Sequence, residues 1–234
     1  MLASARARPD DRRVPITTIL FDAGGTIVFP SFRRIADELG AGGLAADPAD
    51  LARADAEVRF ELDRPEVIAA TTDGSRFRRY LDGLARKVGL DRVPDPVFAR
   101  LEAYHNSHNL WEDVPPDVPA ALASLRGRFR LGVVSNANGT VRAKLARVNL
   151  AAFFETVVDS HEEGVEKPDP RIFAVALARL GVRSTETAYV GDLFHVDVVG
   201  ARAAGLKPFL LDPAGLHAGR AVDRIRALAE LAAA

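Results

Sequence analysis

The feature that most constrains this chain is the apolar run 16–21, which is followed at once by Asp22, a pair of glycines and Thr26. A short apolar run that is rich in β-branched residues and bounded by glycine predicts a buried strand. That strand would carry Asp22 into a glycine-rich turn at the carboxyl edge of a sheet, where open α/β folds bind their ligands. There Asp22 could attack phosphorus as a covalent nucleophile, or it could only form the turn. This stretch alone leaves both interpretations open.

Three later stretches each place a hydroxyl, a lysine or an acid at the end of a predicted element. They are Ser135-Asn136 after the apolar run 129–134, Lys167 just before the helix start Asp169-Pro170, and Asp192 after the run 187–190, with Asp197 five residues further on. Taken singly, each is more often a turn former, a solvated lysine or a pair of helix N-terminal acids. Their order along one chain favours a shared site.

An acid, a hydroxyl, a lysine and an acid pair follow one another in the order of the four motifs of the haloacid dehalogenase-like hydrolase superfamily. The chain resembles that superfamily over roughly residues 15–212. The resemblance implies a Rossmann-like core and a Mg²⁺-dependent phosphatase that forms an aspartyl-phosphate on Asp22. It also implies that the substrate is a small phosphorylated metabolite.

The resemblance further implies a role for each motif residue. Asp22 would be the nucleophile, and Ser135, Asn136 and Lys167 would bind the phosphoryl group, with Lys167 neutralising its charge. Mg²⁺ prefers oxygen ligands and would be bound by Asp22, Asp192 and the backbone carbonyl of Gly24. Asp197 would support the ion from behind these ligands.

Gly24 departs from the pattern of the family, whose phosphatases usually have a second aspartate at this position. That aspartate protonates the leaving group and activates water, which is typically worth about 10²–10⁴ in rate. Three outcomes follow. The enzyme could be limited to good leaving groups; His105, His108, His195 or a bound water could replace the acid; or the chain could bind phosphorylated ligands without turning them over.

Alternating strand and helix patterns predict an α/β fold with a doubly wound parallel sheet, interrupted by one long helical stretch. Four helical patterns without a strand predict a helical cap domain over residues 31–112, inserted after the first strand. The α/β core would then comprise residues 15–30 and 113–234. We expect helix starts at Asp47-Pro48 and Asp73, a helix over 196–204 and a final helix over 220–232. Residues 1–14, which are rich in arginine, are expected to form a disordered tail.

Composition narrows the class of protein. The 234 residues have a net charge of −1 and contain no cysteine, so neither a bulk nucleic-acid binder nor a thiolate zinc site is indicated. No apolar stretch approaches the ~20 residues needed to span a membrane. We therefore expect a cytoplasmic enzyme, monomeric or homodimeric, that binds neither nucleic acid nor membranes.

Two other activities of the family are less favoured by these residues. Members that cleave carbon–phosphorus bonds use a cap lysine as a Schiff base, and Lys87 is the only lysine in the insert, in a polar context that favours solvation. Dehalogenation is disfavoured because the pair Asp192 and Asp197 is typical of the metal-dependent members. The main alternative is a catalytically impaired phospholigand-binding or scaffold protein on the same fold.

Overall fold

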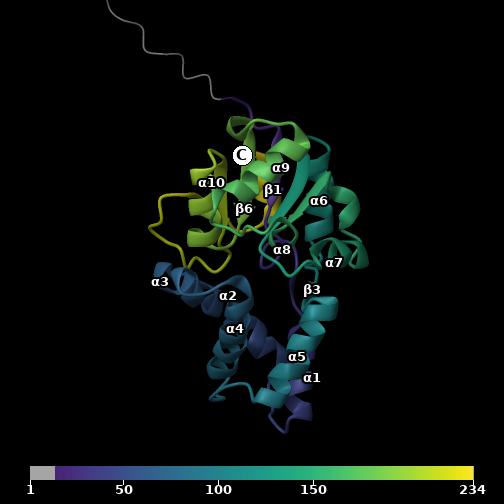
Figure 1. The fold of residues 1–234 in the computed structure, drawn as a ribbon, viewed down its shortest axis with the longest axis vertical. Helices are drawn as coiled ribbons and strands as arrows, with labels where there is room; N and C mark the ends of the chain where they lie inside the picture. The colour runs from purple at the N-terminus through teal and green to yellow at the C-terminus, as the bar shows by residue number, and fades with distance from the viewer. Residues whose placement is uncertain (1–13, 234) are drawn as a thin grey trace, which may run out of the picture.

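The computed structural model describes residues 14–233 and contains an α/β core beside a group of helices (Figure 1). The core holds a six-stranded sheet in the order β5-β4-β1-β6-β7-β8, in which every neighbouring pair is parallel. Its strands are β1 (Thr18–Phe21), β4 (Arg130–Ser135), β5 (Thr156–Asp159), β6 (Thr187–Gly191), β7 (Lys207–Leu211) and β8 (Asp223–Ile225). The predicted α/β class with a parallel sheet is confirmed.

Helices cover both faces of this sheet because successive side chains of each strand point to opposite faces. In β1, Ile19 and Phe21 pack with α6 (Val118–Arg126) and α7 (Val141–Arg147), whereas Leu20 packs with α9 (Pro170–Leu180) and α10 (Val199–Ala203). A short helix, α8 (Ser160–Glu163), follows β5. Both clusters consist of fully or nearly buried side chains, so the sheet is a rigid base for residues at its edge.

The second group of helices, here called the helical lobe (residues 32–108), lies below the core in Figure 1. It consists of α1 (Phe32–Ala41), α2 (Pro48–Leu62), α3 (Pro65–Ala69), α4 (Asp73–Lys87) and α5 (Asp95–His108). Its own hydrophobic cluster is made of residues between 35 and 110. Two short antiparallel strands, β2 (Phe29–Pro30) and β3 (Trp111–Asp113), pair where the chain enters and leaves the lobe.

Several sequence predictions within the lobe can be compared with the structure. Asp47 caps α2 as expected, accepting the Ala49 N–H at 2.7 Å. The cap of α4 is Thr72 rather than Asp73, because Thr72 and Ser75 form a reciprocal capping box. A fifth helix, α3, was not predicted, since five residues are too few to show a helical period. The boundaries of the expected cap domain, 31 and 112, remain a prediction.

The predicted helix over 220–232 is wrong. Residues 223–225 form β8, which pairs with β7 at the edge of the sheet, and a 3-10 helix covers Leu228–Ala233. Strand pairing buries Ile225, and the three-residue spacing of the 3-10 helix buries Leu228 and Leu231. The predicted helix over 196–204 begins earlier, with a π-helical turn over Phe194–Val198 ahead of α10.

The predicted tail, residues 1–14, lies outside the described residues except for Val14. Among the helices of residues 14–233, none is both long enough and apolar enough to cross a membrane.

Candidate active site

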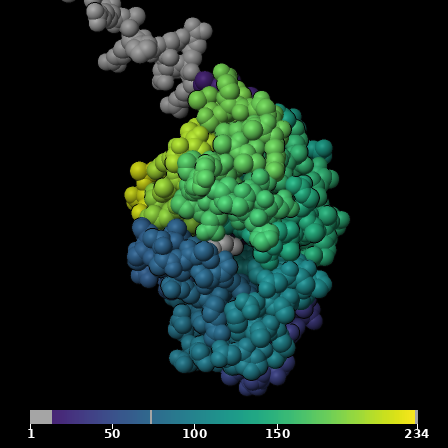
Figure 2. Space-filling model, viewed as in Figure 1, coloured from purple at the N-terminus to yellow at the C-terminus, as the bar shows by residue number. Residues whose placement is uncertain are grey.

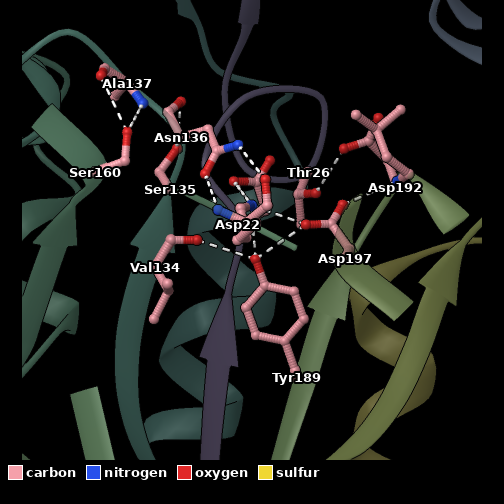
Figure 3. Close-up of polar contacts among 12 residues, drawn as sticks. Asp22, Thr26, Val134, Ser135, Asn136, Ala137, Ser160, Tyr189, Asp192 and Asp197 are labelled. Carbon is pink, nitrogen blue, oxygen red and sulfur yellow. Dashed lines mark hydrogen bonds and ion pairs between the residues drawn. The ribbon is translucent and has the colours of Figure 1, made fainter. Parts of the chain in front are cut away.

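The site lies at the carboxyl edge of the sheet. There the chain leads from β4 outward to β5 on one side and from β6 outward to β7 on the other. β1 is central, with β4 on one side and β6 on the other. Asp22 follows β1, Ser135 ends β4 and Asp192 follows β6, so three predicted site residues meet above adjacent strands (Figure 3). This is the place at which open α/β sheets bind ligands.

Lys167 is the centre of the polar network. Its Nζ atom donates to Asp22 Oδ1 at 2.7 Å, to Asp197 Oδ1 at 2.7 Å and to the Tyr189 hydroxyl at 2.8 Å. Burial alone would lower the pKa of Lys167, but the charges of Asp197 and Asp22 outweigh it and raise that pKa. Lys167 therefore stays charged, with all three ammonium donors in use.

Tyr189 is the residue of this network that sequence reasoning missed. Its hydroxyl lies 2.9 Å from the Val134 carbonyl, to which it donates, and accepts from Lys167 below the site (Figure 3). Within the strand 187–190 Tyr189 looked like one more core residue. The available signal was weak: a buried tyrosine hydroxyl needs a partner.

Three carboxylates could hold a cation. One oxygen from each of Asp22, Asp192 and Asp197 lies within 4.8 Å of the other two, and all three residues are buried. Burial raises the pKa of Asp22 despite the attraction of Lys167, and it raises that of Asp192 to about 7 although Arg59 opposes the shift. A cation bound among these buried carboxylates would favour their charged forms.

The donor set suits a hard divalent cation such as Mg²⁺, because every candidate ligand is an oxygen. Within residues 14–233 no protein group donates a hydrogen bond to the Gly24 carbonyl, so this oxygen could serve as a further ligand. Asp197 accepts from the buried Lys167 ammonium at Oδ1 and from the Leu193 backbone N–H at Oδ2. That arrangement suits a supporting role better than direct ligation.

Ser135 and Asn136 lie beside Asp22 at the end of β4. Ser135 is buried, and its hydroxyl is 3.4 Å from the Asn136 carbonyl, a weak bond that a better acceptor could replace. The Asn136 side chain instead fixes the Lys167 backbone: it donates to the Lys167 carbonyl at 3.0 Å and accepts the Lys167 N–H at 2.7 Å. In this structure the amide of Asn136 therefore positions Lys167 rather than pointing freely at a phosphoryl group.

A family model described as haloacid dehalogenase-like hydrolase matches residues 16–205, which contain every residue of this network. The chain belongs to the haloacid dehalogenase-like (HAD) hydrolase family. Among curated proteins, the hydrolase is 37% identical over 198 residues to the glyceraldehyde 3-phosphate phosphatase of Methanopyrus kandleri, with 82% of each chain covered. Relatives of this kind are named phosphatases, so the chain is an enzyme of the hydrolase class in the phosphatase branch of the family.

Solved structures agree on the fold. The HAD phosphatase of Thermococcus onnurineus is 26% identical with a TM-score of 0.59, covering 92% of this chain and 96% of that one. The HAD-hydrolase YfnB of Bacillus subtilis, solved bound to magnesium, is 20% identical with a TM-score of 0.70, covering 93% of this chain and 97% of that one. The second likeness shows only that the hydrolase has the same fold.

The helical lobe contributes one ionic contact to the site that the sequence did not reveal. Arg59 of α2 is ion-paired with Asp192 and with Asp55, the latter at 2.8 Å. Burial alone would lower the pKa of Arg59, but the charges of Asp192 and Asp55 outweigh it and raise that pKa. Nothing in an arginine-rich sequence distinguishes Arg59 from Arg53, the other arginine of α2.

None of the three histidines is well placed to replace the missing acid. His105 lines the cavity, but burial lowers its pKa to about 4, so it is neutral near pH 7 and has no proton to donate from an imidazolium. His108 is exposed and stacks on Tyr104. His195 is bonded to Asp63 through its backbone N–H and its Nδ1 atom.

A cavity of about 570 Å³ opens onto Asp22 and is lined by residues of both the core and the helical lobe. In Figure 2 the molecular surface is hollowed where the blue lobe meets the green core. Lys87 does not line this cavity: it is exposed and pairs with Glu57 at 2.9 Å and Glu61 at 2.8 Å. This position agrees with surface solvation and gives no support to a Schiff-base role.

Proposed function

We propose that the hydrolase is a Mg²⁺-dependent phosphatase that transfers a phosphoryl group from a small phosphorylated metabolite to Asp22 and then to water. The observation that carries the proposal is the placement of Asp22. Its carboxylate lies at the carboxyl end of β1 and accepts a hydrogen bond from Lys167. One of its oxygens lies within 4.8 Å of a carboxylate oxygen of Asp192 and of Asp197.

The chain's own residues would perform the first step as follows. A carboxylate oxygen of Asp22 attacks phosphorus, and the bond from phosphorus to the leaving-group oxygen breaks. The Ser135 hydroxyl and the Lys167 ammonium stabilise the charge on the equatorial oxygens. Mg²⁺ bound by Asp22, Asp192 and the Gly24 carbonyl would add charge neutralisation at the same oxygens. Lys167 would act through its charge, because its three N–H donors are held by Asp22, Asp197 and Tyr189.

The helical lobe is proposed to act as the cap domain that closes the cavity and selects the substrate. Support comes from its separate hydrophobic cluster and from the residues that it contributes to the cavity. The substrate is then a small phosphorylated metabolite. Glyceraldehyde 3-phosphate belongs in the first test panel, because a relative that acts on it is 37% identical. We further propose a cytoplasmic monomer or homodimer without nucleic-acid or membrane partners, which sedimentation of the purified protein can begin to test.

Phosphate release from 4-nitrophenyl phosphate tests the proposal directly. We expect turnover that requires Mg²⁺, that stops in excess chelator and returns when Mg²⁺ is restored, and that is lost in Asp22→Asn while the circular dichroism spectrum is unchanged. Undiminished turnover in Asp22→Asn would refute the covalent mechanism. The second candidate, a non-catalytic phospholigand-binding protein, is favoured only by Gly24 and predicts binding of phosphorylated ligands without phosphate release.

A further inference from the structure

Trp111 occupies the space beside Gly24 into which a side chain at position 24 would extend. A Cβ atom placed on Gly24 would lie 3.1 Å from Cδ1 and 3.2 Å from Nε1 of the Trp111 indole. Gly24 does not have the positive φ that by itself would require glycine, so the indole, rather than the backbone, is what makes this position small. Both residues line the cavity with Asp22.

The indole is fixed in this position from several sides. Its ring packs against Tyr80 at 5.4 Å and His105 at 5.4 Å between ring centroids. The Trp111 backbone N–H donates to the Asn109 side chain at 3.0 Å, and Asn109 has the unusual φ of 68° that turns the chain out of α5. An indole held by packing and backbone contacts loses little further freedom when it meets a ligand.

The indole N–H is the polar atom nearest to this space. Within residues 14–233, Trp111 Nε1 donates to no acceptor. The atom is also not one of the fully buried polar atoms without a partner, so it is at least partly accessible. It can therefore reach a ligand in the cavity. An indole N–H donates a hydrogen bond but neither accepts one nor gives up its proton.

We propose that the Trp111 indole N–H replaces the missing carboxylic acid as the hydrogen-bond donor to the leaving-group oxygen, and thereby restricts the hydrolase to phosphates whose leaving group departs as a stable anion. The class comprises acyl, enol and aryl phosphates. This inference rests on the proposed phosphatase function and names its substrate class.

The reaction balances without a proton donor. When Asp22 attacks, the electron pair of the breaking phosphorus–oxygen bond goes to the leaving group, which departs as a carboxylate, enolate or phenolate bonded to the indole N–H. In the second step a water oxygen attacks phosphorus, the electron pair returns to the Asp22 carboxylate, and the product is dihydrogen phosphate, which retains both protons of the water. A simple alkoxide is too basic to leave in this way.

The first test measures single-turnover release of phenols of graded acidity from their phosphates, in Mg²⁺, by the wild type, Trp111→Phe and Phe77→Leu. Phe77 packs against the same indole but its replacement keeps the N–H, which makes it a matched control. We expect Trp111→Phe to slow the least acidic phenol by about tenfold or more and the most acidic one much less, since a bond to a charged acceptor is lost. Phe77→Leu should slow all phenols by one common factor.

The second test uses the fact that Trp111 is the only tryptophan of the chain, so tryptophan emission reports this side chain alone. In Asp22→Asn, which should bind without reacting, phenyl phosphate with Mg²⁺ should change the emission with the same dissociation constant that calorimetry gives. This measurement keeps the proposal testable even if Trp111→Phe does not fold.

A uniform slowing of all phenols by Trp111→Phe, no slowing at all, or calorimetric binding with unchanged emission would overturn the role of Trp111. These results differ from failure of the proposed function itself. In that case the wild type would release no phenol from any aryl phosphate and both proposals would fall together.

Discussion

Arg59 of the helical lobe and Asp192 of the core form an ion pair across 133 residues of sequence. Arg59 Nη1 bonds Asp192 Oδ2, and Thr26 donates to the other oxygen, Oδ1, at 3.3 Å. Both oxygens of the proposed metal ligand are thus engaged by protein groups. A divalent cation that binds Asp192 must compete with the Arg59 guanidinium or displace it.

This competition gives the first prediction. Arg59→Met should tighten Mg²⁺ binding by roughly tenfold, equivalent to about 1.4 kcal/mol, because a competing cation is removed from Asp192. Calorimetric titration of the protein with Mg²⁺ measures the change. Arg53→Met on the same helix, whose side chain is 73% exposed, should leave the affinity unchanged. Weaker Mg²⁺ binding in Arg59→Met would show that Arg59 assists the metal site instead.

The second prediction concerns Lys167 and Lys87, each of which pairs with two carboxylates. Lys167→Met should lower the free energy of unfolding by about 3–5 kcal/mol, because Asp22 and Asp197 would be left buried without their cation. Lys87→Met should leave the free energy of unfolding nearly unchanged, since its partners Glu57 and Glu61 are exposed. Urea unfolding of both variants checks this, and equal losses would contradict it.

The third prediction concerns pH and the joint between lobe and core. Asp63, at the end of α2, accepts the backbone N–H groups of Phe194 and His195, and burial raises its pKa from 3.8 to about 8. A raised pKa means that the folded state favours the protonated acid. Protonated Asp63 therefore stabilises the folded state in full below about pH 4, and this stabilisation is lost as the pH rises towards about 8.

Between about pH 4 and pH 8 the unfolding free energy of the wild type should therefore fall by up to about 1.4 kcal/mol per pH unit because of Asp63. In Asp63→Asn this part of the pH dependence should be absent. The measurement is urea unfolding at several pH values for the wild type and the variant. Parallel pH profiles for the two proteins would show that Asp63 does not titrate in the folded state.

The fourth prediction concerns restoration of the missing acid. Gly24→Asp alone should give no gain on alkyl phosphates, because the new side chain would meet the Trp111 indole at about 3.1 Å. Gly24→Asp combined with Trp111→Leu should make room for the carboxyl group and raise turnover of alkyl phosphates by up to ~10²-fold. Steady-state phosphate release from glycerol phosphates measures both. A full gain in Gly24→Asp alone would contradict this prediction, because it would show that the Trp111 indole moves aside at little cost.

The sequence predicted the core of the fold well, because its strands end on distinctive residues. Asp22, Ser135 and Asp192 each end or follow an apolar run, and parallel strands bring their carboxyl ends to one edge. The segment 220–232, wrongly predicted as a helix, contains no such distinctive residue at the end of a strand. Its alanine-rich pattern was compatible with a helix, and only the open edge of β7 selected a strand.

The parts of the site that the sequence did not reveal are those set by tertiary contact. Arg59 lies on a predicted helix, and Trp111 is an apolar residue just after another predicted helix. Neither local pattern points to the site. Their positions depend on how the lobe lies against the core, which no local period encodes. Asn136 illustrates the same limit, since its contact with Lys167 joins residues 31 apart.

The central claim is that Asp22 becomes phosphorylated, and mass spectrometry of the trapped enzyme tests it most directly. The hydrolase is mixed with 4-nitrophenyl phosphate and Mg²⁺, quenched in acid within the first turnover, digested, and its peptides weighed. We predict one phosphoryl group on the peptide that carries Asp22, and none on the same peptide of Asp22→Asn. Steady phosphate release with that peptide unmodified at every quench time, and with Asp22→Asn still active, would contradict the account.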